Sequence, residues 1–464
     1  MKKTYCVIKQ ALCLVAFALL AACSSSPEGE LLGSSTDKNW NWEGNVEVKD
    51  GVVSVSPNTQ MILASGNYKN FELEMELQTV DNGKGYIQFH TDNTLSKGYK
   101  IAINNDRNDQ QWWRMTGSLL SVRNLTKSFA RDNEWFKMRL HVNGQNIAVY
   151  INDNPVVEYV EPAQPYRISP NDNARVSNGT LAVVSNGEGK IQFKSMKVTS
   201  LPENQADADF PVVALDEQKD PIIKLHQEDF PVLDYHVHLK GGLTKERAAQ
   251  QSRQTGINYA IAPNCGLKFP VTTDQDIYNF IDTMRTQPFI LAMQAEGREW
   301  LTLFSEKARG EFDYIFSDAL TFFDNKNRRT RLWINDEVWI ENEEKYMDLI
   351  VEKSCAVMEE PIDIFVNPTF LPEQMNDRYD QFWTDARIDK FVAALVKNGK
   401  ALEINELYKI PSKKIIMKAK EAGVKFTFGS NNVTPDVSDL GYSLKMKEEC
   451  GLTAENMYKP KVKR

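Results

Sequence analysis

The sequence has few histidines, few cysteines and no excess of positive charge. Only five of its 464 residues are histidine and six are cysteine, and the formal net charge is −8. Proteins that bind nucleic acid usually carry a basic surface, so we expect no nucleic-acid partner. Three cysteines, Cys265, Cys355 and Cys450, follow Cys23 in the chain. Because an odd number cannot pair completely, we expect no disulfide framework.

Long hydrophobic runs are also scarce, which argues against a transmembrane helix. The apolar run at residues 11–20 is too short to span a bilayer comfortably, and Lys2, Lys3 and Lys9 precede it. A basic start followed by a short apolar segment is typical of a signal peptide, which we place at residues 1–22.

The end of this segment resembles the lipobox of bacterial lipoproteins. It reads Leu20-Ala21-Ala22-Cys23, where small residues fit the signal peptidase and the cysteine thiol accepts a diacylglyceryl group. The resemblance implies lipidation at Cys23, a tether over 23–38 and a lipid anchor in the bacterial cell envelope. The outer membrane is favoured, with the periplasmic or the surface face left open. The alternative is an ordinary cleaved signal with an incidental cysteine.

Residues 39–200 show the pattern of a β-sandwich. Short runs alternate apolar and polar residues, and turn dipeptides such as Asp50-Gly51 and Asn143-Gly144 separate them. No long helical stretch interrupts the pattern, which favours an all-β antiparallel sandwich of the concanavalin-like jelly-roll type. The expected strands are 46–48, 52–55, 71–77, 86–90, 99–103, 136–142, 147–151, 181–184 and 191–198.

The pattern of apolar and polar residues changes after a proline-containing linker at 201–228. Over 229–458, short apolar runs alternate with amphipathic helical stretches, which predicts a parallel sheet closed into an α/β barrel. The expected strands are 233–238, 259–262, 289–295, 314–316, 362–366, 401–404 and 425–428. The expected helices are 245–255, 274–286, 343–358, 385–398 and 412–422.

Two histidines stand at the end of the first barrel strand. Strand alternation places His236 and His238 on one face, so both imidazoles can reach one metal ion. The competing interpretation is a pair of structural histidines. In such barrels the chemistry lies at the carboxyl ends of the strands.

Residues 230–452 resemble the PHP family, the polymerase and histidinol phosphatase-like metal-dependent barrels of PHP/TIM-like type. The resemblance rests on an ordered series of segments: Asp234-Tyr235-His236-Val237-His238, Ala295-Glu296-Gly297, 363–368, Leu402-Glu403-Ile404-Asn405 and Gly429-Ser430-Asn431-Asn432. Several family ligands are replaced here, by Asn264, Leu320, Asn367, Asn431 and Val433. The resemblance therefore implies a reduced site that holds one divalent metal ion (zinc, manganese or iron) through His236, His238 and Glu296.

Other polar residues of the barrel are candidates for chemistry or substrate binding. Glu403 is a candidate acid–base group, or else a carboxylate that orients a loop. Arg298 is a candidate for binding an anionic or polyol substrate, or else a solvated surface charge. Asn264, Asn367 and Asn431 are candidate substrate-facing amides.

The first half resembles a second family, the 3-keto-disaccharide hydrolase-like sandwiches of exported sugar-processing proteins. The matching segments are 68–73, 98–100, 116–117, 134–135 and 191–193. Lys100 stands where that family tends to have glutamate, and Asn186 lies near a position usually held by histidine. We expect a concave face on which Trp112, Trp113 and His90 contact a sugar, although tryptophan in a sandwich also serves in the core.

Together these patterns predict an envelope-anchored lipoprotein of carbohydrate processing. The barrel would be a metal-dependent hydrolase or lyase for a saccharide or small polyol substrate, and the sandwich would bind glycan. The alternative is a non-catalytic glycan-binding lipoprotein with a degenerate PHP barrel. Because a fold does not determine a reaction, the sequence leaves both open.

Overall fold

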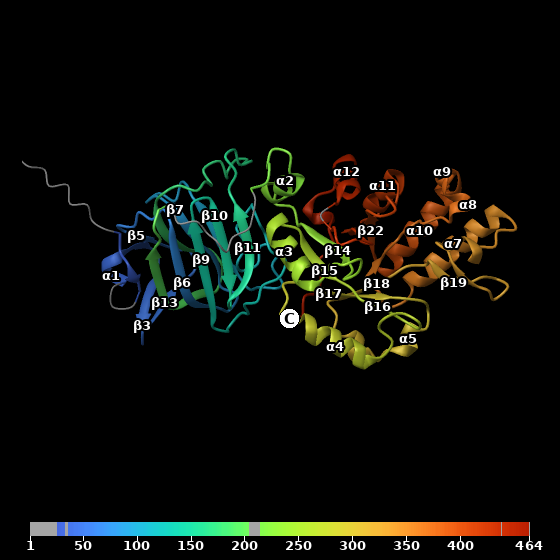
Figure 1. The fold of residues 1–464 in the computed structure, drawn as a ribbon, viewed down its shortest axis with the longest axis horizontal. Helices are drawn as coiled ribbons and strands as arrows, with labels where there is room; N and C mark the ends of the chain where they lie inside the picture. Colours follow the sequence, from blue (N-terminus) through green and yellow to red (C-terminus); the bar gives the residue numbers. More distant parts are fainter. Residues whose placement is uncertain (1–25, 33–35, 204–213, 438, 464) are drawn as a thin grey trace, which may run out of the picture.

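The computed structural model describes residues 26–32, 36–203, 214–437 and 439–463. It contains a sandwich, coloured blue to green, and a barrel, coloured yellow-green to red, which lie side by side along the long axis of the molecule (Figure 1). The predicted signal peptide and the lipidation site at Cys23 lie outside the described residues. Within the described ranges, no helix combines the length and apolar character needed to cross a membrane.

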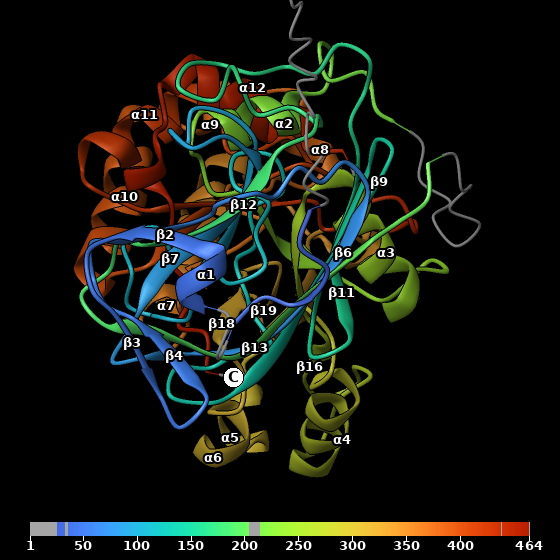
Figure 2. The same cartoon turned by 90° about the vertical axis from the view of Figure 1, so that its left-hand side faces the viewer.

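Two antiparallel sheets form the sandwich (Figure 2), which confirms the predicted fold class of the first half. One sheet has the order β11-β10-β9-β6-β13-β4-β3, with β1 beside β13, and the other has the order β2-β5-β12-β7-β8. The first sheet comprises β1 (Gly29–Glu30), β3 (Val46–Lys49), β4 (Val52–Val55), β6 (Phe71–Val80), β9 (Phe136–Asn143), β10 (Asn146–Ile151), β11 (Asn154–Val160) and β13 (Lys190–Ser200). The second comprises β2 (Trp40–Glu43), β5 (Thr59–Leu63), β7 (Lys84–Thr91), β8 (Tyr99–Asn104) and β12 (Thr180–Ser185).

Alternation along each strand builds the core between the two sheets. In β6, Leu73 and Met75 are buried while Glu74 between them is exposed. Leu73 lies opposite Leu140 of β9 and Val198 of β13, so three strands contribute to one apolar row. A period of two buries one face of each strand and leaves the other for water or ligand.

The barrel has seven parallel strands, which confirms the predicted α/β barrel. The strands are β14 (Leu233–Val237), β15 (Asn258–Ile261), β17 (Ile290–Ala295), β18 (Tyr314–Ser317), β21 (Ile364–Phe365), β22 (Ala401–Asn405) and β23 (Phe426–Gly429). They follow one another around the barrel in chain order, and the pairing of β15 with β17 completes the ring. The short β16 (Asn264–Cys265) extends alongside β17.

Helices cover the outside of this ring, with small ones at the loops. The longer helices are α3 (Lys245–Thr255), α4 (Asp274–Met284), α7 (Glu343–Met358), α10 (Asp385–Asn398), α11 (Lys413–Glu421) and α12 (Gly441–Cys450). Shorter ones are α2 (Pro221–Gln227), α5 (Trp300–Leu303), α6 (Glu306–Arg309), α8 (Glu373–Asn376) and α9 (Tyr379–Phe382), with 3₁₀ turns at Asn335–Glu337 and Ala454–Asn456. The short α1 (Thr36–Asn39) belongs to the sandwich, where it precedes β2. The hairpin of β19 (Thr321–Phe323) and β20 (Arg329–Arg331) follows β18.

Two tryptophans of the sandwich pack against the interior of the barrel. Trp112 and Trp113 are only 6% and 7% exposed, and they share an apolar cluster with inward-facing barrel residues such as Leu233, Tyr235 and Tyr314. Trp113 also contacts Asp229, which precedes β14 in the chain. The sandwich therefore closes the amino end of the barrel, and the carboxyl ends of the strands face away from it (Figure 1).

Candidate functional site

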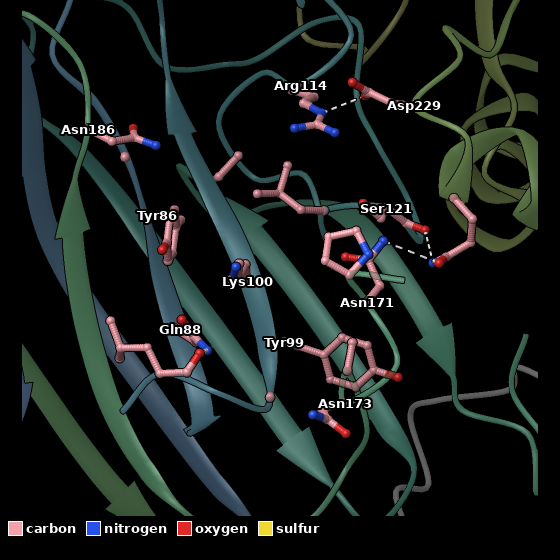
Figure 3. Close-up of a pocket in the computed structure, with 18 of the residues that line it drawn as sticks. Tyr86, Gln88, Tyr99, Lys100, Arg114, Ser121, Asn171, Asn173, Asn186 and Asp229 are labelled. Carbon is pink, nitrogen blue, oxygen red and sulfur yellow. Dashed lines mark hydrogen bonds and ion pairs between the residues drawn. The ribbon is translucent and has the colours of Figure 1, made fainter. Parts of the chain in front are cut away.

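A cavity of about 600 Å³ opens on the outer face of the β2-β5-β12-β7-β8 sheet (Figure 3). Strands β7 and β8 form its floor, and loops near residues 111–121 and 168–174 form its walls together with the segment 227–229. The side chains around it include Tyr86, Gln88, Lys100, Arg114, Asn171, Asn186 and Asp229. A volume of this size is typical of sites that bind small molecules.

Strand alternation explains the polar floor of the cavity. In β7, Ile87 and Phe89 belong to the core of the sandwich, so their neighbours Tyr86 and Gln88 face outward. The same period in β8 points Lys100 into the cavity. Gln88 and Lys100 lie directly opposite each other across the β7–β8 pair. The floor is therefore a row of polar and aromatic side chains on a rigid sheet.

Lys100 is the central cation of this floor. Its Nζ lies 4.9 Å from the centroid of the Tyr86 ring, within the range of a cation–π contact. Burial lowers the pKa of Lys100 below its ordinary value, and the positive charge of Arg114 adds to this effect. Both causes disfavour the charged amine in the absence of an anion.

Asp229 connects one wall of the cavity to the barrel. Its Oδ1 accepts hydrogen bonds from Trp113 Nε1 at 2.8 Å and from Arg114 Nε at 2.7 Å. Its Oδ2 accepts a hydrogen bond from Gln111 Nε2 at 2.8 Å. Since Asp229 leads directly into β14, the barrel segment completes a cavity whose floor belongs to the sandwich.

A second group of polar side chains gathers at the carboxyl ends of the barrel strands. His236 and His238 stand at the end of β14. The other members are Asn264 in β16, Gln294 and Glu296 at the end of β17, Asp318 after β18, Asn367 after β21, Glu403 and Asn405 in β22, and Asn431 after β23. All of them except Asn264 are buried. We call this group the barrel-mouth cluster.

The two histidines of the barrel-mouth cluster are held through their Nδ1 atoms. His236 Nδ1 lies 2.6 Å from Glu403 Oε1, and His238 Nδ1 lies 2.7 Å from the Ala262 carbonyl oxygen. The ring centroids are 4.9 Å apart. His236 Nε2 lies 3.3 Å from Gln294 Oε1, while the buried Nε2 of His238 has no hydrogen-bond partner among the described residues.

Two further buried carboxyl groups belong to the barrel-mouth cluster. Glu296 Oε1 accepts a hydrogen bond from Asn264 Nδ2 at 2.7 Å, and Asp318 Oδ2 accepts one from Asn367 Nδ2 at 2.7 Å. Burial, with the negative charge of Asp318 second, raises the pKa of Glu296 to about 8. Burial also raises the pKa of Asp318. In the absence of a cation, this pair therefore favours a form with a bound proton.

The barrel-mouth cluster fits a metal ion only in part. An imidazole whose Nδ1 is held by a carboxylate or a carbonyl is the usual form of a metal-binding histidine, and both histidines have it. Within the described ranges, however, no three histidine, cysteine, aspartate or glutamate side chains are grouped to hold a metal. Of the predicted ligands, His236 and His238 thus have imidazoles oriented for a metal, but Glu296 is not grouped with them as a third ligand.

The placements of Glu403 and Arg298 differ from their predicted catalytic roles. Glu403 is fully buried, and its second oxygen accepts hydrogen bonds from the Asn367 backbone at 2.7 Å and from Asn405 Nδ2 at 2.9 Å. It therefore positions His236 and the Asn367 loop and has no free face for a substrate. Arg298 is paired with Glu360 at 2.8 Å and donates to Ser317 Oγ, so its guanidinium braces the loop after β17.

The predicted substrate-facing amides mostly bind one another. Asn367 Oδ1 accepts hydrogen bonds from Asn405 at 3.0 Å and from Asn431 at 2.9 Å. Asn264 donates to both Gln294 and Glu296 and is the least buried of the three predicted amides. Asn264 is therefore the one best placed to meet a ligand.

The predicted sugar contacts of the sandwich are corrected by the structure. Trp112 and Trp113 are buried against the barrel and present no face to the cavity. His90 is fully buried, where its Nε2 lies 2.9 Å from the Lys69 carbonyl oxygen and its Nδ1 accepts from the Ser177 backbone. The two tryptophans bury a large apolar surface, which stabilises the fold, and His90 is held by backbone hydrogen bonds on both ring nitrogens.

The sequence patterns do not indicate that the residues of the cavity floor bind a ligand. The alternation predicts only that Tyr86 and Gln88 lie in a strand, and Lys100 differs from the glutamate that the resembled family tends to have. The signal was present in the alternation of β7 and β8, where the polar positions share one face. That alternation does not indicate which face of the sheet the loops near residues 111–121 and 168–174 cover.

Comparison with known families identifies the class of the first half. Residues 30–199 match the model of the 3-keto-alpha-glucoside-1,2-lyase-like domain, so the predicted resemblance of the sandwich is confirmed. The matched segment ends with β13 and does not extend into the barrel. The resemblance of the barrel to PHP proteins stays a prediction. The sequence matches no curated protein.

Two solved structures illustrate the likeness of the sandwich. One is a putative glycosyl hydrolase from Parabacteroides distasonis, with 16% identity over 38% of this chain and 100% of the other, at a TM-score of 0.32. Another is the carbohydrate binding module CBM66 from Bacillus subtilis, with 13% identity over 35% of this chain and 96% of the other, at a TM-score of 0.27.

Proposed function

We propose that the protein binds a saccharide in the cavity of its sandwich and serves in carbohydrate processing. The observation that carries the proposal is the polar, aromatic floor of β7 and β8, which lies in the segment that matches the lyase-like domain. A saccharide has many hydroxyl groups and apolar ring faces. Amides, a cation and the Tyr86 ring match both kinds of surface.

Loss of the aromatic floor tests this proposal. We expect Tyr86→Ala to weaken glycan binding about tenfold, because a ring contact contributes about 1 kcal/mol beyond its buried area. The measurement is a glycan array followed by calorimetry on the full chain without its predicted signal peptide. Tyr150→Ala, on β10 of the other sheet, is the matched control. Equal affinities of the wild type and Tyr86→Ala would contradict a site on this floor.

A second candidate function belongs to the barrel-mouth cluster. We propose that it is a metal-dependent hydrolase or lyase site for a saccharide or small polyol, in which His236 and His238 bind one zinc, manganese or iron ion. The support is the engagement of both Nδ1 atoms, which leaves the Nε2 of His238 without a hydrogen-bond partner among the described residues. The Nε2 of His236 would exchange its contact with Gln294 Oε1 for the metal. A divalent metal there would polarise a substrate oxygen or activate water. Asn264 would then bind the substrate at the rim.

Metal analysis separates this candidate from the alternative of a degenerate barrel. The purified wild type should hold about one equivalent of metal, and the His236→Ala/His238→Ala variant should lose it. His141→Ala on β9 is the control, since that histidine pairs with Glu72 in the sandwich. Equal metal in all three proteins, or none after incubation with each metal, would favour a non-catalytic glycan-binding lipoprotein.

The proposal also includes a lipid anchor in the cell envelope. Its support is the lipobox-like sequence that ends in Cys23. In a bacterial host, a radiolabelled fatty acid should be incorporated into the wild type and not into Cys23→Ser, with Cys355→Ser as the control. Labelling of Cys23→Ser at the wild-type level would rule out this anchor.

A further inference from the structure

The charges around the sandwich cavity are unbalanced. Its lining contains four cations, Lys84, Lys97, Lys100 and Arg114, and two carboxylates, Glu228 and Asp229. The chain as a whole carries a net charge of −8, so this local excess of positive charge runs against the composition of the protein.

Existing ion pairs account for both carboxylates of the cavity. Asp229 pairs with Arg114 at 2.7 Å, and Glu228 pairs with Lys447 at 2.5 Å. Lys84 pairs with Asp109. Each of these charges therefore already has a partner, and neither carboxylate is left to neutralise Lys100.

Lys100 has no carboxylate partner among the described residues, although it stands in the middle of the floor. Its neighbours in β8, Tyr99 and Ile101, are anchored in the core, so the side chain projects into the cavity (Figure 3). Its amine contacts the Tyr86 ring. A partly buried cation beside another cation is unfavourable without an anion.

Gln88 supplies an independent sign of a ligand. It lines the cavity and is only 1% exposed, and its Oε1 has no hydrogen-bond partner among the described residues. Its Nε2, in contrast, donates to the carbonyl oxygens of Leu95 and Lys97. A buried acceptor without a donor costs free energy, and a ligand hydroxyl group would satisfy it.

We propose that the cavity recognises an anionic saccharide, whose carboxylate or sulfate group pairs with Lys100 while a ring hydroxyl group donates to Gln88. The inference rests on the proposed saccharide-binding function and names the class of saccharide. Gln88 and Lys100 are directly opposite, so their Cβ atoms lie about 5 Å apart, and one acidic sugar unit can reach both side chains.

The test is an array of neutral, uronate-containing and sulfated oligosaccharides, probed with the full chain and followed by calorimetry on the best acidic ligand. The wild type should bind acidic glycans in preference to neutral ones. Lys100→Met should weaken that binding about ten- to a hundred-fold, and Lys100→Glu should abolish it. Lys137→Met, an exposed lysine on β9 of the other sheet, should leave it unchanged. The uronate and sulfate arms show which anion is recognised.

Three outcomes would overturn the inference. Preferential binding of neutral glycans would overturn it while leaving the proposed saccharide site intact. Acidic binding that is unaffected by Lys100→Met in a folded protein would show that the anion lies elsewhere. Binding of no glycan of either charge would remove the proposed function together with this inference. Circular dichroism of each variant establishes that the protein remains folded.

Discussion

Trp113 of the sandwich donates a hydrogen bond from its indole nitrogen to Asp229 of the segment that leads into the barrel, over 2.8 Å. The indole ring packs against the interior of the barrel, while the carboxylate lines the sandwich cavity. One contact thus connects the closed end of the barrel to the wall of the candidate saccharide site. We therefore expect the two halves to unfold as one cooperative unit.

Removal of the Asp229 carboxylate tests this connection. Asp229→Ala leaves the donors of Gln111, Trp113 and Arg114 without their acceptor, and we expect a loss of about 1–3 kcal/mol in the free energy of unfolding. Urea denaturation followed by fluorescence measures it. Asp216→Ala, at an exposed ion pair with Lys219, should change stability by less than about 1 kcal/mol. Equal effects of the two variants would show that the connection is weak.

The two buried tryptophans should be structural and not sugar-binding. Trp112→Ala and Trp113→Ala should each lower the free energy of unfolding by about 3–5 kcal/mol, since each leaves a large cavity at the amino end of the barrel. Trp42→Ala is the control, because Trp42 is 38% exposed. If Trp112→Phe lowered the glycan affinity without changing the stability, the predicted contact between Trp112 and a sugar would be supported instead.

Buried neutral histidines should make the protein sensitive to mild acid. Burial lowers the pKa of His90 to about 4 and that of His226 to about 3, both below the ordinary value of about 6.5. As pH falls below about 6.5, the unfolded chain takes up these protons first, so the free energy of unfolding falls until pH reaches the folded-state pKa. Above about pH 7 both histidines are neutral in the folded and the unfolded chain, so the free energy of unfolding no longer depends on their protonation.

A substitution isolates the contribution of His90. The stability of His90→Gln should depend on pH less steeply than that of the wild type between about pH 6 and pH 4, by about 1 kcal/mol per pH unit. Chemical denaturation at each pH gives the two slopes. Parallel curves would show that the pKa of His90 is not lowered in the folded state.

Glu403 should act through His236 and the Asn367 loop. Glu403→Ala leaves His236 Nδ1 and the Asn367 backbone amide without this acceptor in a buried site, and it removes one of the two acceptors of Asn405 Nδ2. We expect a loss of about 3–5 kcal/mol in the free energy of unfolding. Glu403→Gln keeps an acceptor and should cost less. Glu421→Ala, at the exposed end of α11, is the control. A loss below about 1 kcal/mol for Glu403→Ala would contradict this role.

Much of the fold could be predicted because its signals are local. The period of two in β6 and the helical period of α10 each follow from which side chains are buried on one face. The sequence patterns do not predict strands β2, β5 and β11. In β11, Pro155 obscures the pattern, and an edge strand tolerates it because one side of the strand needs no hydrogen bonds.

In the candidate sites, too, some features follow from local sequence patterns and others depend on tertiary contacts. The sequence alone determined that His236 and His238 share a face, because alternation along a strand needs no partner to be read. Only the tertiary structure decided that Trp112 and Trp113 close the barrel and that Glu403 binds His236. It also decided that Lys100 lines a cavity without a carboxylate partner among the described residues. Each of these depends on contacts between segments far apart in the chain. Such contacts are set by how two packed layers meet, which the period of any single strand or helix does not contain.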